Sequence, residues 1–351
     1  MARLAIIARA DATGLGNQTR RLVEMLNPER VLVIDSTPFN QNQQDFTFFE
    51  PYNWYKVTGF PDRQQITNFL RGMDIVLSCE TFYNKSFVKV ADSLGVKTLL
   101  QFNYEFLDYL QDPSLELPTK LLSPSHWHMD ELSEKFNNVI YLPPPMDMSN
   151  FYTNGILNYK RNNTKRRFLH IVGKGAYLDR NGTLDLLESL KYTKSDFELV
   201  IKYQTISDEV KNHPQAQDPR VIFDSEAPKN EADLYKDFDA MILPRRYAGQ
   251  CLPMNEALAS CLPVIMTDID PNNKILPENW LVKSHKVGEF MTRAMIDYYS
   301  ADHKALAKTI DNLCKNDLQS DKEAAYAIAE ANFCKELLLD KYTELINEVT
   351  Q

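Results

Sequence analysis

The sequence predicts two α/β domains, each built on a parallel sheet, followed by a helical tail. Short apolar runs alternate with amphipathic segments along both halves of the chain, which is the pattern of βα units. One polar and basic stretch separates the two halves. The length of 351 residues also suits two domains better than one.

The first half, residues 1–150, is predicted to form one α/β domain. Helices such as Gln18–Leu26 and Phe87–Leu94 show the apolar spacing of amphipathic helices. The prolines at 143–145 end the alternation, because proline cannot donate to a strand ladder. The predicted strands are Leu4–Ala8, Val31–Ile34, Ile75–Ser78, Thr98–Gln101, Lys120–Ser123 and Val139–Leu142.

The rest of the chain is predicted to form a linker, a second α/β domain and a helical end. Residues 151–166 are polar and basic, which is typical of a linker. The alternation restarts in residues 167–335, and from about Val287 onward the composition predicts helix. We expect residues 336–351 to form a helix that can pack back on the first domain. The predicted strands are Phe168–Val172, Glu198–Ile201, Val221–Phe223, Ala240–Leu243 and Val264–Met266.

Composition and charge narrow the class of protein. Hydrophobic residues make up 44% and charged residues 25%, as in globular proteins. The net charge of −9 argues against binding nucleic acid or membranes through bulk charge, although a local basic patch stays open. Five irregularly spaced cysteines without a C-x-x-C motif suggest reduced thiols rather than a zinc or disulfide framework. With neither a signal peptide nor a membrane-spanning segment apparent, we expect a cytoplasmic protein.

A glycine-containing loop, residues 13–17, follows the first predicted strand. Its glycines allow a tight turn and close approach of a ligand, and the amides of the next helix suit an anion or a sugar hydroxyl. A dinucleotide fingerprint would need a third glycine where Thr19 stands, so a nicotinamide enzyme is a weaker alternative. A second alternative is that the loop forms a tight turn and binds no ligand. We favour a loop facing a ligand cleft, with Gly14, Gly16 and Asn17 as cleft residues.

The most informative segment is 240–268. It predicts a strand, a glycine-containing loop, a helix with Pro253 in its first turn, and another strand. Glu256 then lies about one turn into the helix. Backbone amides of the loop would face the C-terminal edge of the sheet, where open α/β sheets bind ligands. The loop residues in question are Gly249, Gln250 and Cys251.

This segment resembles the donor-site signature of the family-four retaining glycosyltransferases. The matching residues are Leu243-Pro244, Gly249, Leu252-Pro253, Glu256-Ala257 and Pro263-Val264-Ile265. The resemblance implies a GT-B enzyme, in which two Rossmann-like domains face a central cleft and a nucleotide sugar is the donor. It assigns Leu252 to the donor site and Glu256 to the ribose hydroxyls, which a carboxylate can accept together. A solvent-facing helix glutamate is the alternative.

One position departs from the family pattern. Ala248 stands where the family has a glutamate that helps to hold the donor sugar. This change leaves open a protein that binds a nucleotide sugar without catalysing transfer. Gln250 and the loop amides are candidates for holding the donor sugar in place of that glutamate.

A second match occurs around 170–182. It resembles the family's Val-Gly-Arg strand end and its following Lys-Gly, whose two cations bind the donor pyrophosphate. The resemblance therefore assigns Lys174, beside Gly173, and Arg180 to catalysis, since fixed cations stabilise charge that grows on a leaving diphosphate. Lys202 can add a third cation to this pair. For each of the three residues, the alternative is a solvated surface charge. The family also implies retention at the anomeric carbon and no metal or other cofactor.

The acceptor side is expected near residues 101–105. The family often has a histidine there, and this chain has none. Asn103 and Tyr104 are therefore acceptor-side candidates, and Glu105 is a candidate catalytic group. His126 and His128, which are close in sequence, are expected to cap or to pack.

Residues 8–28 resemble phage-encoded glycosyltransferases, some of which modify hydroxymethylated bases in DNA. A duplex base would have to flip out to react, and such an enzyme would work in the host cytoplasm. The alternative acceptor is a glycan or a small molecule, and the alternative role of the basic residues is that of a solvated linker. Cations that could follow a phosphate backbone are Lys160, Arg161, Lys165, Arg166 and Arg167, with Arg20, Arg21, Arg245 and Arg246 elsewhere.

Overall fold

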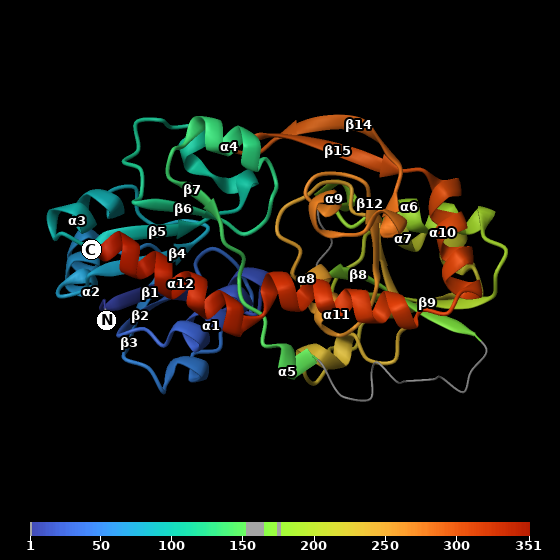
Figure 1. The fold of residues 1–351 in the computed structure, drawn as a ribbon, viewed down its shortest axis with the longest axis horizontal. Coiled ribbons are helices and arrows are strands. Elements are labelled where there is room, and N and C mark those ends of the chain that lie inside the picture. The colour runs from blue at the N-terminus through green and yellow to red at the C-terminus, as the bar shows by residue number, and fades with distance from the viewer. Residues whose placement is uncertain (1, 152–164, 174–176) are drawn as a thin grey trace. The chain divides into compact units, whose positions relative to one another are not determined.

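The computed structural model describes residues 2–151, 165–173 and 177–351 (Figure 1). It contains two compact units. The N-terminal unit comprises Met1–Met146, Thr292–Ala294 and Phe333–Gln351, and the C-terminal unit comprises Asp147–Met291 and Met295–Asn332. Thus the last helix, predicted over 336–351, is grouped with the first unit, as is a short segment at 292–294.

The N-terminal unit is built on a seven-stranded parallel sheet with the order β3-β2-β1-β4-β5-β6-β7. Strands β1 and β4 are almost wholly buried, which explains their continuous apolar runs. The sequence did not predict β3, an edge strand whose exposed residues lack an apolar run. The strands are β1 (Leu4–Arg9), β2 (Arg30–Asp35), β3 (Trp54–Thr58), β4 (Ile75–Cys79), β5 (Lys97–Gln101), β6 (Lys120–Ser123) and β7 (Val139–Tyr141).

Helices complete the core of this unit. Helix α1 begins at Gly14, earlier than predicted, because the Thr13 side chain caps it by accepting a hydrogen bond from Gly16 N. Helix α12 contributes Leu338, Tyr342 and other side chains to the core formed by the β-strands. The helices are α1 (Gly14–Leu26), α2 (Arg63–Leu70), α3 (Phe87–Ser93), α4 (Met129–Lys135) and α12 (Lys335–Thr350), with single 3₁₀ turns at Thr47–Phe49, Tyr104–Phe106 and Asp108–Leu110.

The C-terminal unit repeats the architecture with a six-stranded parallel sheet of order β10-β9-β8-β11-β12-β13. Strand β8 begins at Arg166, so the predicted linker extends one residue too far. The strands are β8 (Arg166–Gly173), β9 (Phe197–Tyr203), β10 (Val221–Asp224), β11 (Ala240–Leu243), β12 (Val264–Thr267) and β13 (Leu281–Val282). The helices are α5 (Met148–Phe151), α6 (Thr183–Ser189), α7 (Asp208–Lys211), α8 (Leu252–Ala259), α9 (Asn272–Ile275), α10 (His303–Lys315) and α11 (Gln319–Phe333), with 3₁₀ turns at Tyr177–Asp179, Leu190–Tyr192, Pro214–Gln217, Glu231–Leu234 and Glu278–Trp280.

The prediction of helix from about Val287 is wrong. Strands β14 (Ser284–Met291) and β15 (Met295–Ala301) form an antiparallel hairpin, and helix begins only at His303, where Asp302 caps α10. The hairpin is rich in aromatic and β-branched residues, which favour strand, whereas the Ala- and Lys-rich composition belongs to α10 and beyond. Within the described residues, no helix is both long and apolar enough to cross a membrane.

Candidate active site

Each sheet has one point at which the strand order reverses. It lies between β1 and β4 in the N-terminal unit and between β8 and β11 in the C-terminal unit. In open parallel sheets, ligands bind outside the carboxyl ends of the strands at this switch point. The predicted donor residues follow β8 and β11, and the glycine loop follows β1. The topology therefore gathers each set at the ligand-binding edge of its own sheet.

The loops after β8 and β11 are joined by hydrogen bonds. Arg180 Nη2 donates to the Ala248 carbonyl oxygen over 2.5 Å, and the Arg180 guanidinium lies over the Tyr247 ring, 4.9 Å from its centroid. The Arg246 amide donates to the Arg180 carbonyl oxygen over 2.9 Å. Arg180 therefore braces the loop after β11, a role that the sequence did not suggest. Lys174, the second predicted catalytic cation, lies outside the described residues.

Two glycines shape the edge beside Arg180. Gly173 ends β8 with φ +67°, and no described atom lies within 4 Å of where its Cβ would be. Gly182 precedes α6 with φ +72°, and a Cβ there would lie 2.0 Å from the Pro244 carbonyl oxygen. Because that oxygen belongs to the backbone, only glycine fits at 182.

The loop before α8 contains an unsatisfied polar group. Gly249 has φ +117°, and Cys251 and Leu252 are buried where the helix begins. The Gln250 side-chain nitrogen Nε2 is buried and has no hydrogen-bond partner among the described residues. Burying an amide N–H without an acceptor costs free energy, so this atom marks a position that a ligand can complete.

Glu256 is buried, contrary to the alternative of a solvent-facing glutamate. It is 8% exposed, and its Oε2 accepts a hydrogen bond from the Tyr235 hydroxyl over 2.5 Å. Tyr235 is itself buried and follows a 3₁₀ turn. The sequence did not identify Tyr235, because nothing in its local pattern marks a partner that is 21 residues away.

Lys202, predicted to join the donor patch, has a partner within its own sheet. It lies opposite Asp224 in the β9–β10 register, and its Nζ is 2.5 Å from Asp224 Oδ2. The Lys202 side chain is only 18% exposed. Its charge is thus largely compensated before any ligand binds.

In the N-terminal unit, Glu80, which no sequence motif marks, lies near Asn103 and Glu105. Glu80 follows β4 and receives a hydrogen bond from the Asn103 side chain. Burial raises the pKa of Glu80; the Arg9 charge opposes this shift, and the Glu105 carboxylate adds to it. Glu105 is 6% exposed. A polar residue directly after a buried strand at the switch point is the signal that could have found Glu80.

The glycine loop packs tightly against the end of β1. A Cβ on Gly16 would lie 1.9 Å from the Asp11 carbonyl oxygen, so glycine is required for the helix start to approach the strand. Gly14 is the first residue of α1, and the Asn17 amide donates to the Thr13 carbonyl oxygen over 2.9 Å. These contacts explain Gly16 by packing; the ligand-facing role of the loop stays a prediction.

Tyr104 and the two histidines form aromatic contacts. The Tyr104 hydroxyl donates to Glu131 Oε2 over 3.0 Å, and its ring stacks on His128 with centroids 4.2 Å apart. His126 stacks on Tyr141 with centroids 3.9 Å apart. Both histidines therefore pack against rings, and Tyr104 has a polar partner already.

The described part of the basic cluster is paired with carboxylates. Lys165, Arg166 and Arg167 lie 2.8, 3.2 and 3.5 Å from oxygens of Asp196, Asp239 and Glu198, respectively. Lys160 and Arg161 lie outside the described residues. The other four cations also face the protein: Arg20 donates to Ala10 O, Arg21 to Met146 Sδ and Arg246 to Tyr299 O, and Arg245 is 4% exposed.

No metal-binding cluster occurs in the parts of the chain that the structure describes: no three His, Cys, Asp or Glu side chains lie close enough to share an ion. The unpartnered Gln250 amide and the buried Glu256 carboxylate offer a hydrogen-bond donor and an acceptor. Such groups suit hydroxyls and phosphate or sugar oxygens.

Comparison with known proteins relates part of the chain to one enzyme family. Residues 164–316, which include the loops after β8 and β11, match the family described as Glycosyl transferases group 1. No curated protein gives a significant sequence match.

Solved structures resemble the whole chain at low identity. A glycosyltransferase from Rickettsia africae ESF-5 has 16% identity and a TM-score of 0.74, over 99% of this chain and 98% of that one. Sucrose-phosphate synthase from Thermosynechococcus elongatus has 14% identity and a TM-score of 0.71, over 99% of both chains. HepE from Anabaena, in complex with UDP and glucose, has 11% identity and a TM-score of 0.70, over 99% of this chain and 100% of that one.

These similarities confirm the predicted GT-B fold class, with two parallel-sheet α/β units and C-terminal helices. The match of residues 164–316 to Glycosyl transferases group 1 classes the protein as a glycosyltransferase.

Proposed function

We propose that the protein transfers a sugar from a nucleotide-sugar donor, bound by the C-terminal unit, to a hydroxyl acceptor. The observation that supports this most is the pair of buried groups after β11, Glu256 and the unpartnered amide of Gln250. Both lie in the segment that matches Glycosyl transferases group 1. HepE from Anabaena has been solved with UDP and with UDP-glucose, so uridine nucleotides are the first donors to test.

In this proposal each donor residue has a separate task. Glu256 accepts hydrogen bonds from the ribose hydroxyls, while Tyr235 fixes its carboxylate. Gln250 donates to the donor sugar, a task that the alanine side chain at 248 cannot perform. Lys174 and Arg180 stabilise charge on the leaving diphosphate. The backbone that approaches the donor belongs to Gly173, Gly249, Cys251 and Leu252.

The resemblance of the donor segment to retaining enzymes leads us to propose retention at the anomeric carbon and no metal requirement. Nuclear magnetic resonance of the first product identifies its anomer, and activity in the presence of a chelator tests for a metal. An inverted product or loss of activity with the chelator would contradict this part of the proposal.

For the acceptor, we favour a glycan or a small molecule over DNA. A hydroxymethylated base in phage DNA is the hypothesis that residues 8–28 raised, and it needs cations available to phosphates. Lys165, Arg166 and Arg167 are already paired with carboxylates. Mass spectrometry of modified and unmodified DNA after incubation with an accepted donor tests the DNA hypothesis, which a glycosylated base would restore.

Calorimetry with UDP and UDP-sugars, followed by UDP release from the sugar that binds, tests the proposal itself. We expect binding that Glu256→Gln weakens about tenfold, the equivalent of removing one hydrogen bond to a charged group. The matched control is Glu278→Gln, since Glu278 is exposed in the same unit. Absence of nucleotide binding would refute the proposal. Binding without any UDP release would identify the catalytically silent alternative.

A further inference from the structure

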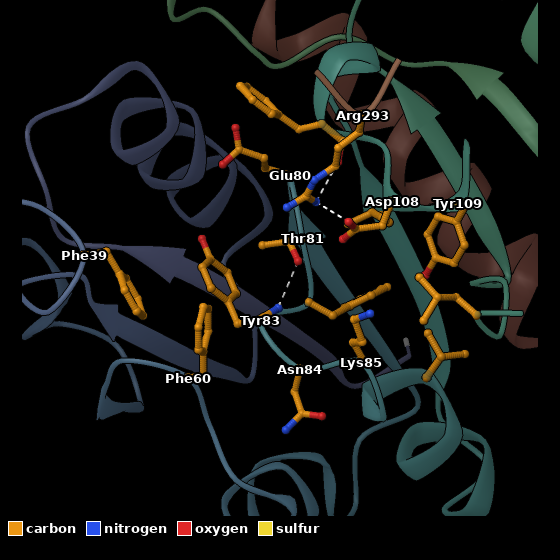
Figure 2. A pocket seen from close by; sticks show the side chains of 15 residues that line it. Phe39, Phe60, Glu80, Thr81, Tyr83, Asn84, Lys85, Asp108, Tyr109 and Arg293 are labelled. Carbon is orange, nitrogen blue, oxygen red and sulfur yellow. Dashed lines mark hydrogen bonds and ion pairs between the residues drawn. The ribbon is translucent and has the colours of Figure 1, made fainter. Parts of the chain in front are cut away.

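The N-terminal unit contains a cavity of about 630 Å³ that the donor site does not use (Figure 2). Its volume falls within the range of about 300–1,000 Å³ typical of small-molecule sites. Most of its wall is apolar, and the polar residues Glu80 and Arg293 also line it. All lining residues belong to the N-terminal unit.

The loop that follows β4 forms part of this cavity in a strained conformation. Glu80 has φ +65° and Tyr83 has φ +60°, backbone angles that residues other than glycine rarely adopt. Hydrogen bonds hold the loop: the Thr81 amide donates to the Cys79 carbonyl oxygen over 2.8 Å, and the Tyr83 amide donates to Thr81 Oγ1 over 3.2 Å. Such strain clusters at functional sites, and this loop lies at the switch point of the sheet.

Two aromatic side chains that line the cavity are exposed to solvent. Phe39 is 47% exposed and Phe60 is 63% exposed, and their ring centroids are 4.6 Å apart. Tyr83 and Tyr109 line the same cavity but are buried. Exposed adjacent rings leave apolar surface unburied, and a flat ligand ring can cover it by stacking.

Polar groups of fixed orientation complete the cavity. Arg293 forms an ion pair with Asp108, which Figure 2 shows, and donates to the Phe106 carbonyl oxygen over 3.2 Å. Glu80 receives the hydrogen bond from Asn103, and its charge is attracted by Arg9 and Arg293 and repelled by Glu105. A carboxylate oxygen accepts several hydrogen bonds, so Glu80 can accept one more from a ligand hydroxyl.

We propose that this cavity binds the sugar acceptor, a small molecule with an aromatic ring beside the hydroxyl that receives the sugar. The inference rests on the proposed function and specifies its acceptor. The ring stacks at Phe60 and Phe39, and the hydroxyl donates to Glu80. In the transfer, the hydroxyl oxygen bonds to the anomeric carbon. The bond from that carbon to the diphosphate breaks with its electron pair on the diphosphate, and the hydroxyl proton passes to the Glu80 carboxylate.

A matched pair of acceptors tests the ring. We expect 4-nitrophenyl β-glucoside to bind the full chain about tenfold more tightly than methyl β-glucoside, since stacking and burial of the ring add roughly 1.4 kcal/mol. Ligand-observed nuclear magnetic resonance measures both affinities without a donor. Equal affinities, or no binding of the aryl glucoside, would overturn the proposal.

Variants locate the binding. Phe60→Ala should remove most of the aryl preference, whereas Tyr55→Ala should keep it, because Tyr55 is also half-exposed in this unit but does not line the cavity. UDP affinity should be unchanged in both. If the two variants behave alike, the cavity is not the site. If UDP and UDP-sugars fail to bind while the aryl preference still depends on Phe60, the donor proposal fails and the cavity assignment stands.

Glu80→Gln tests the hydroxyl contact separately. We expect kcat for transfer to fall about a hundredfold, because the amide cannot take the hydroxyl proton, whereas the weaker hydrogen bond should lower aryl-glucoside affinity by about tenfold at most. Far-ultraviolet circular dichroism checks the fold. An unchanged kcat with the aryl acceptor would show that Glu80 does not contact the reacting hydroxyl.

Discussion

The Tyr235 hydroxyl donates to Glu256 Oε2 over 2.5 Å, and both side chains are buried. This bond joins the turn after β10 to helix α8 within the C-terminal unit. It holds the carboxylate in one orientation in the absence of ligand, which would reduce the entropy that binding of the proposed nucleotide must overcome. Glu256 thus has a structural partner as well as its proposed ligand.

Because of this bond, Glu256→Ala should affect both stability and binding. The variant leaves the buried Tyr235 hydroxyl without its acceptor, which costs about 1–3 kcal/mol of the free energy of unfolding. Tyr235→Phe should weaken UDP binding less than Glu256→Gln does, since the carboxylate remains. Chemical denaturation and calorimetry measure the two effects. A Glu256→Ala protein of unchanged stability would show that the bond contributes nothing to the fold.

Two glycines with left-handed backbone provide a matched pair. Gly173→Ala should cost about 1–2 kcal/mol, the strain of an alanine at positive φ, since no described atom opposes its Cβ. Gly182→Ala incurs the same strain and also places a Cβ 2.0 Å from the Pro244 carbonyl oxygen. We therefore expect a much lower melting temperature for Gly182→Ala, and equal losses would contradict the packing argument.

His170 should make the C-terminal unit sensitive to acid. Its ring bridges the Ile242 carbonyl oxygen and Thr183 Oγ1, and burial lowers its pKa from 6.5 to about 4. Below pH 6.5 the unfolded chain binds a proton that the folded chain refuses until about pH 4. Stability should therefore fall as pH falls through this window, by about 3 kcal/mol in total.

The test compares thermal unfolding between pH 7 and pH 4. His170→Gln should flatten the pH dependence, because glutamine does not titrate. His285→Gln, at an exposed histidine of the same unit, should leave it unchanged. Parallel curves for wild type and His170→Gln would contradict the assignment.

Tyr342 should anchor the C-terminal helix to the N-terminal unit. Its buried hydroxyl accepts from Gln101 Nε2 over 2.8 Å and donates to the Pro143 carbonyl oxygen over 3.2 Å. Tyr342→Phe removes both bonds and should lower the free energy of unfolding by about 1–3 kcal/mol. Tyr55→Phe is the control at a half-exposed site. Urea unfolding measures both, and similar values would mean that the network is energetically neutral.

Where the sequence prediction succeeded, the signal was local. The buried strands have continuous apolar runs, and Pro253 occupies the first turn of α8 as predicted. Where the sequence prediction failed, the residue composition of a segment did not reflect its secondary structure. Strand β3 lies at a sheet edge, so its residues need not be apolar, and the hairpin at 284–301 was assigned to the helical composition that follows it.

The sequence by itself determined the two α/β units, the loops after β8 and β11 and the glycines beside them, because periodicity, glycine and proline act on their immediate neighbours. Only the tertiary structure decided which charged groups are available. It paired Lys202 with Asp224 and Arg167 with Glu198, and it placed Tyr235 on Glu256. These contacts join residues far apart in the chain, and the free energy of burying a charge depends on neighbours that only folding brings together.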